Sequence, residues 1–332
     1  MESAGKSQEN HCFNALKGIA CMGVVFGHAL FPGEFGAVIF VLASEAVPIF
    51  FLISGFYAYD SDRIIVAQKT VRKFRKTVKL TVGACLLYFV WKFVKLWLLG
   101  YSVLDGIGDF NLKNLVKMLL QNDLSFIEAG HFWFLLALIY AYATLIILAK
   151  WNMIHWIYPV IILTFIGRVY MCGNANWHYS QNYWFDGLPY FFTGYYLKAN
   201  ENWKDNISNG FLLVIGMMGI LFKTSGLFYD LGVNIYEVGA ILFALSLFIF
   251  ALKHEYIGEN SVWERLGKQY SLWIYIYHVI VMGILTLYED NMGLRSMPWY
   301  PWCKPLVVFF LTLGLGVIWQ KGRTFILKKK NK

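Results

Sequence analysis

Long apolar stretches follow one another along almost the whole chain, and they restrict what it can fold into. We identify ten stretches able to cross about 30 Å of hydrocarbon when tilted helices and short re-entrant pieces are allowed. Backbone polar groups cannot stay unpaired in lipid, so such stretches form helices. The sequence therefore predicts an all-α, polytopic integral membrane bundle of about ten transmembrane helices. The spans lie near residues 13–31, 36–57, 78–99, 131–149, 153–171, 184–199, 209–225, 233–252, 270–288 and 303–320.

Composition favours a membrane protein over the other classes. Of the 332 residues, 58% are hydrophobic and only 15% are charged. In a soluble domain about a quarter of the residues carry charge. The net charge of +9 then reflects the Lys and Arg of cytoplasmic loops, and nucleic-acid binding is not expected. The five cysteines are scattered, without the spacing of a metal site or a disulfide framework, so no metal cofactor is expected.

The distribution of Lys and Arg predicts the orientation of the spans. With the N-terminus inside, about twenty basic residues lie in inner segments and about seven in outer ones, so both termini are predicted to be cytoplasmic. The N-terminus lacks the basic start of a cleavable signal peptide, which predicts that the first span is retained. We expect residues 1–332 to form a single polytopic domain in the plasma membrane, with no appended soluble domain.

Two ionisable residues, Lys17 and His28, lie inside the first span. They are eleven residues apart, which in a helix is three turns plus about 20°, so they share one face about 16 Å apart along the axis. An ionisable side chain at membrane depth is expensive and is therefore a functional-site candidate by default. The orientation places Lys17 at the cytoplasmic end and His28 toward the outside.

Glu45 lies in the outer half of the second span, close to Pro48, which can kink that span. A carboxylate at this depth needs a cavity or a partner. His28 lies near the outer end of the adjacent span, so Glu45 is a candidate to orient its imidazole and raise its basicity. A buried structural hydrogen bond between neighbouring helices explains the same position, and the sequence leaves both interpretations open.

The loop after the second span is the most basic part of the chain. If it is helical, Lys69, Arg72, Lys76 and Lys79 form one stripe, with Arg75 beside Arg72. Such a stripe at a cytoplasmic surface is usually a topology signal or a contact to anionic lipid. Paired arginines also hold phosphates bidentately, as in a nucleotide-bearing donor, so Arg72 and Arg75 are candidate donor contacts.

Four further ionisable residues lie in or beside later spans. A lone histidine on an apolar face is more often a core residue than a catalyst. Several ionisable groups in one leaflet instead favour a substrate-binding or supporting role. These residues are His131, Arg168, Asp186 and His278.

Together these residues resemble acyltransferase family 3. The spacing from Lys17 to His28, with the ten residues GIACMGVVFG between them, is similar to the Arg/Lys-x10-His signature of that family. Lys17 stands where Arg is usual; it keeps the charge but not the bidentate geometry. Further similar motifs cover most of the chain in the family's order: VPIFFLISGF at 47–56, Arg72-x-x-Arg75, HFWFLLAL at 131–138 and SLWIYIYH at 271–278.

The resemblance implies a ten-helix core that takes an acyl group, usually acetyl, from cytoplasmic acyl-CoA as the co-substrate. The acceptor it implies is a hydroxyl, usually of a cell-surface or lipid-linked sugar. It further implies that His28 is essential and that Lys17, Arg72 and Arg75 contact the donor. Relatives with an appended esterase-like domain acylate peptidoglycan, and the absence of that domain here favours another glycan or a small acceptor.

Acyl transfer from a thioester needs a base or a nucleophile, and histidine is the natural candidate in this chain. His28 can act as a base on the acceptor hydroxyl or carry the acyl group itself, and the sequence does not separate these. A transporter or flippase of a small anionic or glycolipid substrate is the alternative function, although the chain shows no inverted repeat. A weaker alternative is the membrane half of a sensor or uptake partner.

Overall fold

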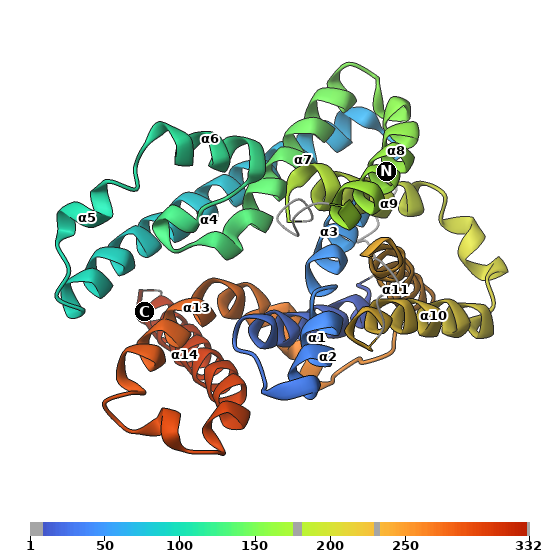
Figure 1. The fold of residues 1–332 in the computed structure, drawn as a ribbon. Coiled ribbons are helices and arrows are strands. Elements are labelled where there is room, and N and C mark those ends of the chain that lie inside the picture. The colour runs from blue at the N-terminus through green and yellow to red at the C-terminus, as the bar shows by residue number, and fades with distance from the viewer. Residues whose placement is uncertain (1–8, 175–180, 229–232, 331–332) are drawn as a thin grey trace. The chain divides into compact units, whose positions relative to one another are not determined.

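The computed structural model describes residues 9–174, 181–228 and 233–330, and all regular elements in these ranges are helical (Figure 1). This confirms the predicted all-α class. The first eight and last two residues, at the termini predicted to be cytoplasmic, lie outside the described ranges. The longer helices are α1 (His11–His28), α2 (Gly33–Ala43), α3 (Ala46–Phe56), α4 (Arg63–Leu98), α6 (Leu112–Gln121), α7 (Trp133–Lys150), α8 (Ile157–Asn174), α9 (Leu188–Ala199), α10 (Asn209–Phe228), α11 (Val233–Lys253), α13 (Ser271–Tyr288) and α14 (Tyr300–Lys330).

Shorter helical segments connect them. Two of these, η5 (Tyr183–Gly187) and η7 (Leu266–Tyr270), are π-helical turns, a geometry frequent at functional sites. The others are α5 (Val103–Ile107), η1 (Ser125–Ile127), η2 (Gly130–Phe132), η3 (Ile154–Trp156), η6 (Glu201–Asn206), α12 (Val262–Arg265) and η8 (Leu294–Ser296).

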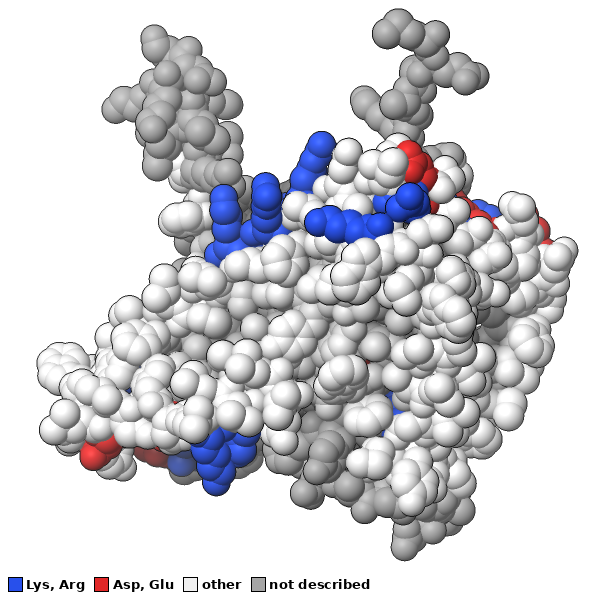
Figure 2. Space-filling model, turned by 90° about the horizontal axis from the view of Figure 1, so that it is seen from above, with Lys and Arg blue, Asp and Glu red and all other residues white. Residues whose placement is uncertain are grey.

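Eight helical stretches among the described residues are long and apolar enough to cross a membrane. They match eight of the ten predicted spans; the stretches near 13–31 and 184–199 are not among them. In the first, Asn14, Lys17 and two histidines lower the hydropathy of α1, and α9 has only 12 residues. On the face drawn in Figure 2 most surface residues carry no charge, and Lys and Arg gather in a few groups. The chain has the character of a membrane protein, while the count of ten spans and the orientation stay predictions.

The chain divides into two compact units. The first unit comprises Met1–Val47, Lys204–Tyr229 and Ala240–Lys332, and the second comprises Pro48–Trp203 and Asp230–Gly239. The first unit therefore contains α1, α2, α10, most of α11, and α12 to α14. The second contains most of α3, α4 to α9 and the start of α11.

In the first unit, α1 packs against α2, α12, η7 and α13. Its N-terminus is capped by Asn10, whose side-chain oxygen accepts a hydrogen bond of 2.7 Å from the backbone N–H of Phe13. The crossing with α12 and η7 brings backbone onto backbone. A Cβ atom added to Gly18 would lie 2.1 Å from the carbonyl oxygen of Trp263, and one added to Gly267 would lie 2.7 Å from the nitrogen of Gly18. Glycine at both positions permits this close approach.

Gly18→Ala is therefore expected to destabilise the first unit by about 1–3 kcal/mol or more, because a methyl group has no space against a backbone carbonyl. Gly27→Ala on the same helix is the matched control, since no atom lies within 4 Å of a Cβ added there. The unfolding midpoint of both purified variants in detergent checks this. Equal unfolding midpoints for the two variants would contradict the close contact between Gly18 and the backbone of α12.

In the second unit, α3 crosses α9 in a similar way, since a Cβ on Gly55 or Gly194 would strike the backbone of the other helix. Helix α4 packs along α7, and α8 packs along α9. Helix α4 begins at Arg63 and has 36 residues, so the basic loop predicted before the third span forms the first turns of that same helix. This confirms that the basic stripe is helical.

The connection between α13 and α14 is held by the buried carboxylate of Glu289. It accepts hydrogen bonds of 2.9 Å from Arg295, Tyr300 and Lys304. Burial alone would raise the pKa of Glu289, but the hydrogen bonds from Lys304, Tyr300 and Arg295 outweigh it and hold the pKa below its ordinary value of 4.5. The carboxylate is therefore ionised at neutral pH and anchors this connection to the first turn of α14.

Glu289→Gln is expected to lower the stability of the first unit by about 1–3 kcal/mol at neutral pH, because an amide replaces a charged acceptor of several donors. A lowered pKa contributes stability above the unfolded-state pKa, and that contribution is lost as the pH falls through the folded-state value. The difference between wild type and variant should therefore shrink below pH 4.5. Unfolding midpoints at neutral and acid pH measure it, and a difference independent of pH would contradict it.

Candidate active site

Helix α1 carries both residues of the predicted Lys-x10-His motif. Lys17 lies one and a half turns from its N-terminal end, and His28 is its last residue. The helix is continuous between them, which confirms that one helix face can present both, about 16 Å apart along the axis. Lys17 is half-buried, whereas His28 is exposed. The histidine is thus accessible to a reactant while it remains anchored to a packed helix.

His28 lies against the second predicted histidine, His278 of α13. Their ring centroids are 5.1 Å apart and the ring planes are tilted by 49°. His278 is fully buried, and its Nδ1 lies 2.9 Å from the carbonyl oxygen of Ile274. A carbonyl only accepts, so this contact assigns the proton of neutral His278 to Nδ1 and leaves Nε2 as the acceptor. The structure therefore brings together two residues that the sequence placed 250 positions apart.

Glu45 lies at a break between α2 and α3, and its observed partner is Lys223 of α10. The Nζ of Lys223 lies 2.5 Å from Oε1 of Glu45, with both side chains almost completely buried. Oε2 of Glu45 makes no hydrogen bond within the described residues. The expected contact between Glu45 and His28 is therefore not found. The geometry instead matches the second interpretation, a buried polar contact between helices.

The break explains why Lys223 binds here. Pro48 lacks the N–H that would bond to Ser44 in a continuous helix, so α2 ends before it. This exposes carbonyl groups at the C-terminal end of α2. Lys223 donates to the carbonyl oxygen of Val41 and to the hydroxyl of Ser44 as well as to Glu45, which accounts for all three donors of its ammonium group. A cation at a helix C-terminus is also favoured by the helix dipole.

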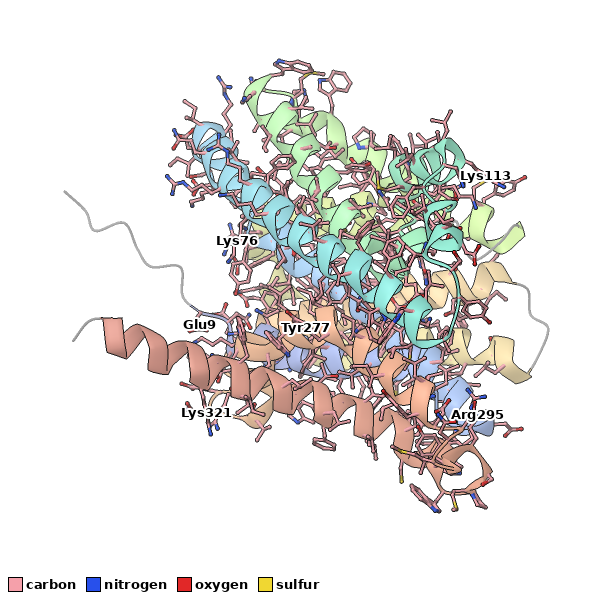
Figure 3. The ribbon with its side chains drawn as sticks, turned by 90° about the vertical axis from the view of Figure 1, so that its left-hand side faces the viewer. Glu9, Lys76, Lys113, Tyr277, Arg295 and Lys321 are labelled. Atoms are coloured by element: carbon pink, nitrogen blue, oxygen red, sulfur yellow. The ribbon has the colours of Figure 1, made fainter. Side chains whose placement is uncertain are left out.

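Arg72 and Arg75 are exposed on the N-terminal half of α4, in the second unit. Two lysines of the same stretch are engaged locally: Lys69 pairs with Asp60, and Lys73 donates to the carbonyl oxygen of Tyr57. Neither arginine forms an ion pair in the part of the chain that the structure describes. Lys76, labelled in Figure 3, is exposed on the same helix. Arg72, Arg75 and Lys76 therefore form an exposed cationic surface on α4.

Arg168 and Asp186 meet in the interior of the second unit. Arg168 forms ion pairs with Asp186, which lies in the π-helical turn η5, and at 2.8 Å with Glu237 of α11. All three residues are at most 5% exposed. The guanidinium also lies over the ring of Tyr190 and donates to the carbonyl oxygen of Phe185. This cluster joins α8, α9 and α11, and its burial favours a supporting role over direct contact with a reactant.

His131, the remaining predicted residue, lies in the short turn η2 before α7. It is buried, and its ring contacts Tyr88 of α4 at 5.1 Å and Phe132 at 4.2 Å between centroids. Close by, Glu128 pairs with Lys95 of α4 at 2.9 Å. These contacts join α4 to the start of α7. His131 is thus placed in the core of the second unit, among aromatic rings.

Two ionisable partners, Lys223 and Glu237, were not selected from the sequence. Both lie inside predicted spans, at 209–225 and 233–252, so the high energy of a charge at membrane depth was a signal that applied to them equally. Each pairs with a carboxylate or guanidinium of another helix, which composition and spacing do not reveal.

The geometry on α1 agrees with the comparisons to known proteins. The family model for an acyltransferase domain, that of acyltransferase family 3, matches residues 10–319 and so covers both units. It includes all nine predicted site residues. No curated protein and no solved structure matched the chain significantly. The chain therefore belongs to acyltransferase family 3 and is a membrane acyltransferase.

Proposed function

We propose that this protein transfers an acyl group, most simply acetyl, from acyl-CoA to a hydroxyl group of a glycan or lipid-linked sugar. The observation that carries the proposal is the pair formed by His28 and His278 at one end of α1, with Lys17 at the other end. Family membership supports acyl transfer, and α1 carries the two proposed functional residues at separate positions. One end suits a phosphate-bearing donor and the other suits a proton transfer.

In this proposal His28 is the base. As the acceptor hydroxyl attacks the thioester carbonyl, His28 takes the hydroxyl proton. The new carbon–oxygen bond forms, the carbon–sulfur bond breaks, and the proton passes to the departing CoA thiolate. The overall reaction yields an ester and free CoA without any further reactant.

His278 has a positioning role beside it. Its Nδ1 is fixed by the carbonyl oxygen of Ile274, so its ring presents a constant orientation to His28. Two neighbouring imidazoles accept one proton far more readily than two because like charges repel. The pair therefore holds one transferred proton during each cycle, which is what a base that must also return the proton requires.

The cationic groups are the proposed contacts to the donor. Lys17 is half-buried on α1, and Arg72 and Arg75 are exposed on α4. Arginine matches phosphate oxygens with a planar pair of donors, and lysine acts as a point charge. Each of these side chains, taken by itself, is suited to a phosphate group such as those of CoA.

Transfer of label by the purified protein tests this function. Protein in proteoliposomes is incubated with radiolabelled acetyl-CoA and with surface glycan extracted from cells that lack the protein. The proposal predicts label on the glycan that mild alkali releases, as expected for an ester, together with free CoA. Label that resists mild alkali would indicate an amide and would refute the hydroxyl acceptor.

The same proteoliposomes address the alternative function of a transporter or flippase. Uptake or counterflow of labelled glycolipid in the absence of acetyl-CoA would favour transport. Under the proposed function, vesicles show no such exchange, and glycan is modified only when acetyl-CoA is present.

A further inference from the structure

The π-helical turn η7 carries a lysine, Lys268, that lies at the same end of the first unit as Lys17. We propose that Lys17 and Lys268 together bind a phosphate group of the acyl-CoA donor, and that Glu9 is the counter-ion which this phosphate displaces. The inference rests on the proposed function, because it assigns the phosphate to the donor of that reaction. It adds a binding residue, Lys268, and an internal competitor, Glu9.

The backbone crossing of α1 and η7 places the two lysines near each other. Each is the immediate neighbour of a glycine at the crossing: Lys17 precedes Gly18, and Lys268 follows Gly267. A Cβ on Gly267 would lie 1.8 Å from the carbonyl oxygen of Asn14, so the two segments touch without any intervening side chain. Both lysines therefore lie beside the same close backbone crossing.

Glu9, which lies just before α1 and is labelled in Figure 3, is the present partner of Lys268. The Nζ of Lys268 lies 2.7 Å from Oε1 of Glu9. The side-chain amide of Asn14 also donates a hydrogen bond of 2.8 Å to the Glu9 carboxylate. The hydrogen bond from Lys268 is the main cause that holds the pKa of Glu9 below its ordinary value, so the carboxylate is charged at neutral pH. One negative charge therefore pairs with Lys268 at the end of α1 that carries Lys17.

A second carboxylate beside η7, that of Glu264, is already engaged. Glu264 accepts from the backbone N–H of Asn260 at 2.7 Å and lies 2.5 Å from Nδ1 of His11. Hydrogen bonding to Glu264 is the main cause that raises the pKa of His11, so this pair carries little net charge when the imidazole is protonated. The lysine pair consequently keeps an excess of positive charge beside it.

Because the ion pair between Glu9 and Lys268 is exposed, another anion can take the place of the Glu9 carboxylate beside Lys268. The side chains of Lys268 and Glu9 are 51% and 44% exposed. An ion pair so open to solvent is weak, because water and salt screen it. A phosphate carries up to about two negative charges and three acceptor oxygens, so it satisfies both lysines where one carboxylate does not. Displacement of Glu9 by phosphate is therefore favourable.

The separation between the lysine pair and His28 along α1 matches the separation of phosphate and thioester in the donor. The lysine pair lies at one end of α1 and His28 at the other, about 16 Å away along the axis. In CoA the phosphates and the thioester are likewise separated, by the pantetheine arm. A phosphate held at the lysine pair leaves that arm to extend along α1 toward His28.

Two substitutions with opposite expected effects test the inference. Lys268→Met should raise the KM for acetyl-CoA by about three- to fivefold, with kcat unchanged, because it removes one exposed cationic contact. Glu9→Gln should lower this KM by about two- to threefold, because it removes the competing carboxylate. A salt bridge that is merely structural would make both variants change the KM in the same direction, or leave it unchanged, and either result overturns the inference.

Controls separate this result from general charge effects and from the proposed function. Glu255→Gln removes the same charge from another ion pair of the first unit, with Lys204, and should leave the KM unchanged. Equilibrium binding of CoA, and of CoA lacking its 3′-phosphate, is measured with the same variants. If the wild type transfers no acyl group, the proposed function fails, while weaker CoA binding by Lys268→Met still supports the lysine pair.

A lipid headgroup offers the same phosphate chemistry. Binding of each variant to CoA is therefore repeated in vesicles of phosphatidylglycerol and in vesicles of phosphatidylcholine. The inference predicts that Lys268→Met weakens CoA binding in both. A variant that alters only the response to phosphatidylglycerol, with CoA binding as in wild type, overturns the assignment to the donor and identifies the headgroup as the ligand.

Discussion

Replacing His28 with alanine is expected to lower the rate of acyl transfer by about 10²- to 10⁴-fold, the range that a lost general base produces. His28 is exposed at the end of α1, so its side chain contributes little to packing and the variant should fold and insert normally. The rate is measured with purified protein, radiolabelled acetyl-CoA and glycan extract, after the unfolding midpoint has been shown to match that of the wild type.

His254→Ala is the matched control, because His254 belongs to the same unit and contacts Asn209 rather than another histidine. It should retain the wild-type rate. His278→Gln should give a smaller loss than His28→Ala and should alter the pH profile of kcat, since His278 acts through His28. A folded His28→Ala protein with the wild-type rate would refute the assigned base.

Lys223→Met is expected to give the largest loss of stability, about 3–5 kcal/mol, because it leaves the carboxylate of Glu45 buried without its counter-ion. Both side chains are at most 3% exposed, so water cannot replace the lost contact. The carbonyl oxygen of Val41 and the hydroxyl of Ser44 lose a donor at the same time. The unfolding midpoint in detergent, together with the yield of monodisperse protein, measures the effect.

The double variant Lys223→Met, Glu45→Gln should recover part of that loss, since it removes the buried charge along with its partner. Lys76→Met is the control for loss of a lysine, because Lys76 is exposed on α4 and its removal should change stability by less than about 0.5 kcal/mol. Equal midpoints for Lys223→Met and Lys76→Met would contradict a structural role of the buried pair.

The features of the fold that were predicted from the sequence are those that depend on local patterns of residues. Apolar runs predict helices because the lipid phase leaves no other way to pair the backbone, and eight of those runs form helical stretches of sufficient length, one of them broken between α2 and α3. The spacing of Lys17 and His28 predicts one shared face, because helical geometry fixes the angle and rise between them. The basic stripe on α4 followed from the same argument.

Contacts between distant helices were harder to predict. The sequence shows that Glu45 needs a partner, but it does not show which helix packs beside the break after α2, and Lys223 of α10 takes that place. The same holds for Glu237, which joins Arg168 and Asp186. Pro48 was predicted to kink its span, yet the helix ends before the proline at Ser44, because that carbonyl loses its donor. Partner choice in these cases depends on tertiary packing.

The most direct measurement of the central claim is mass spectrometry of surface glycans from cells with and without the protein. The account predicts that glycans from cells lacking the protein lose an ester-linked acyl group, that the wild-type gene restores it, and that the gene for His28→Ala does not. Glycans that remain acylated without the protein, or acylation restored by His28→Ala, would contradict the account.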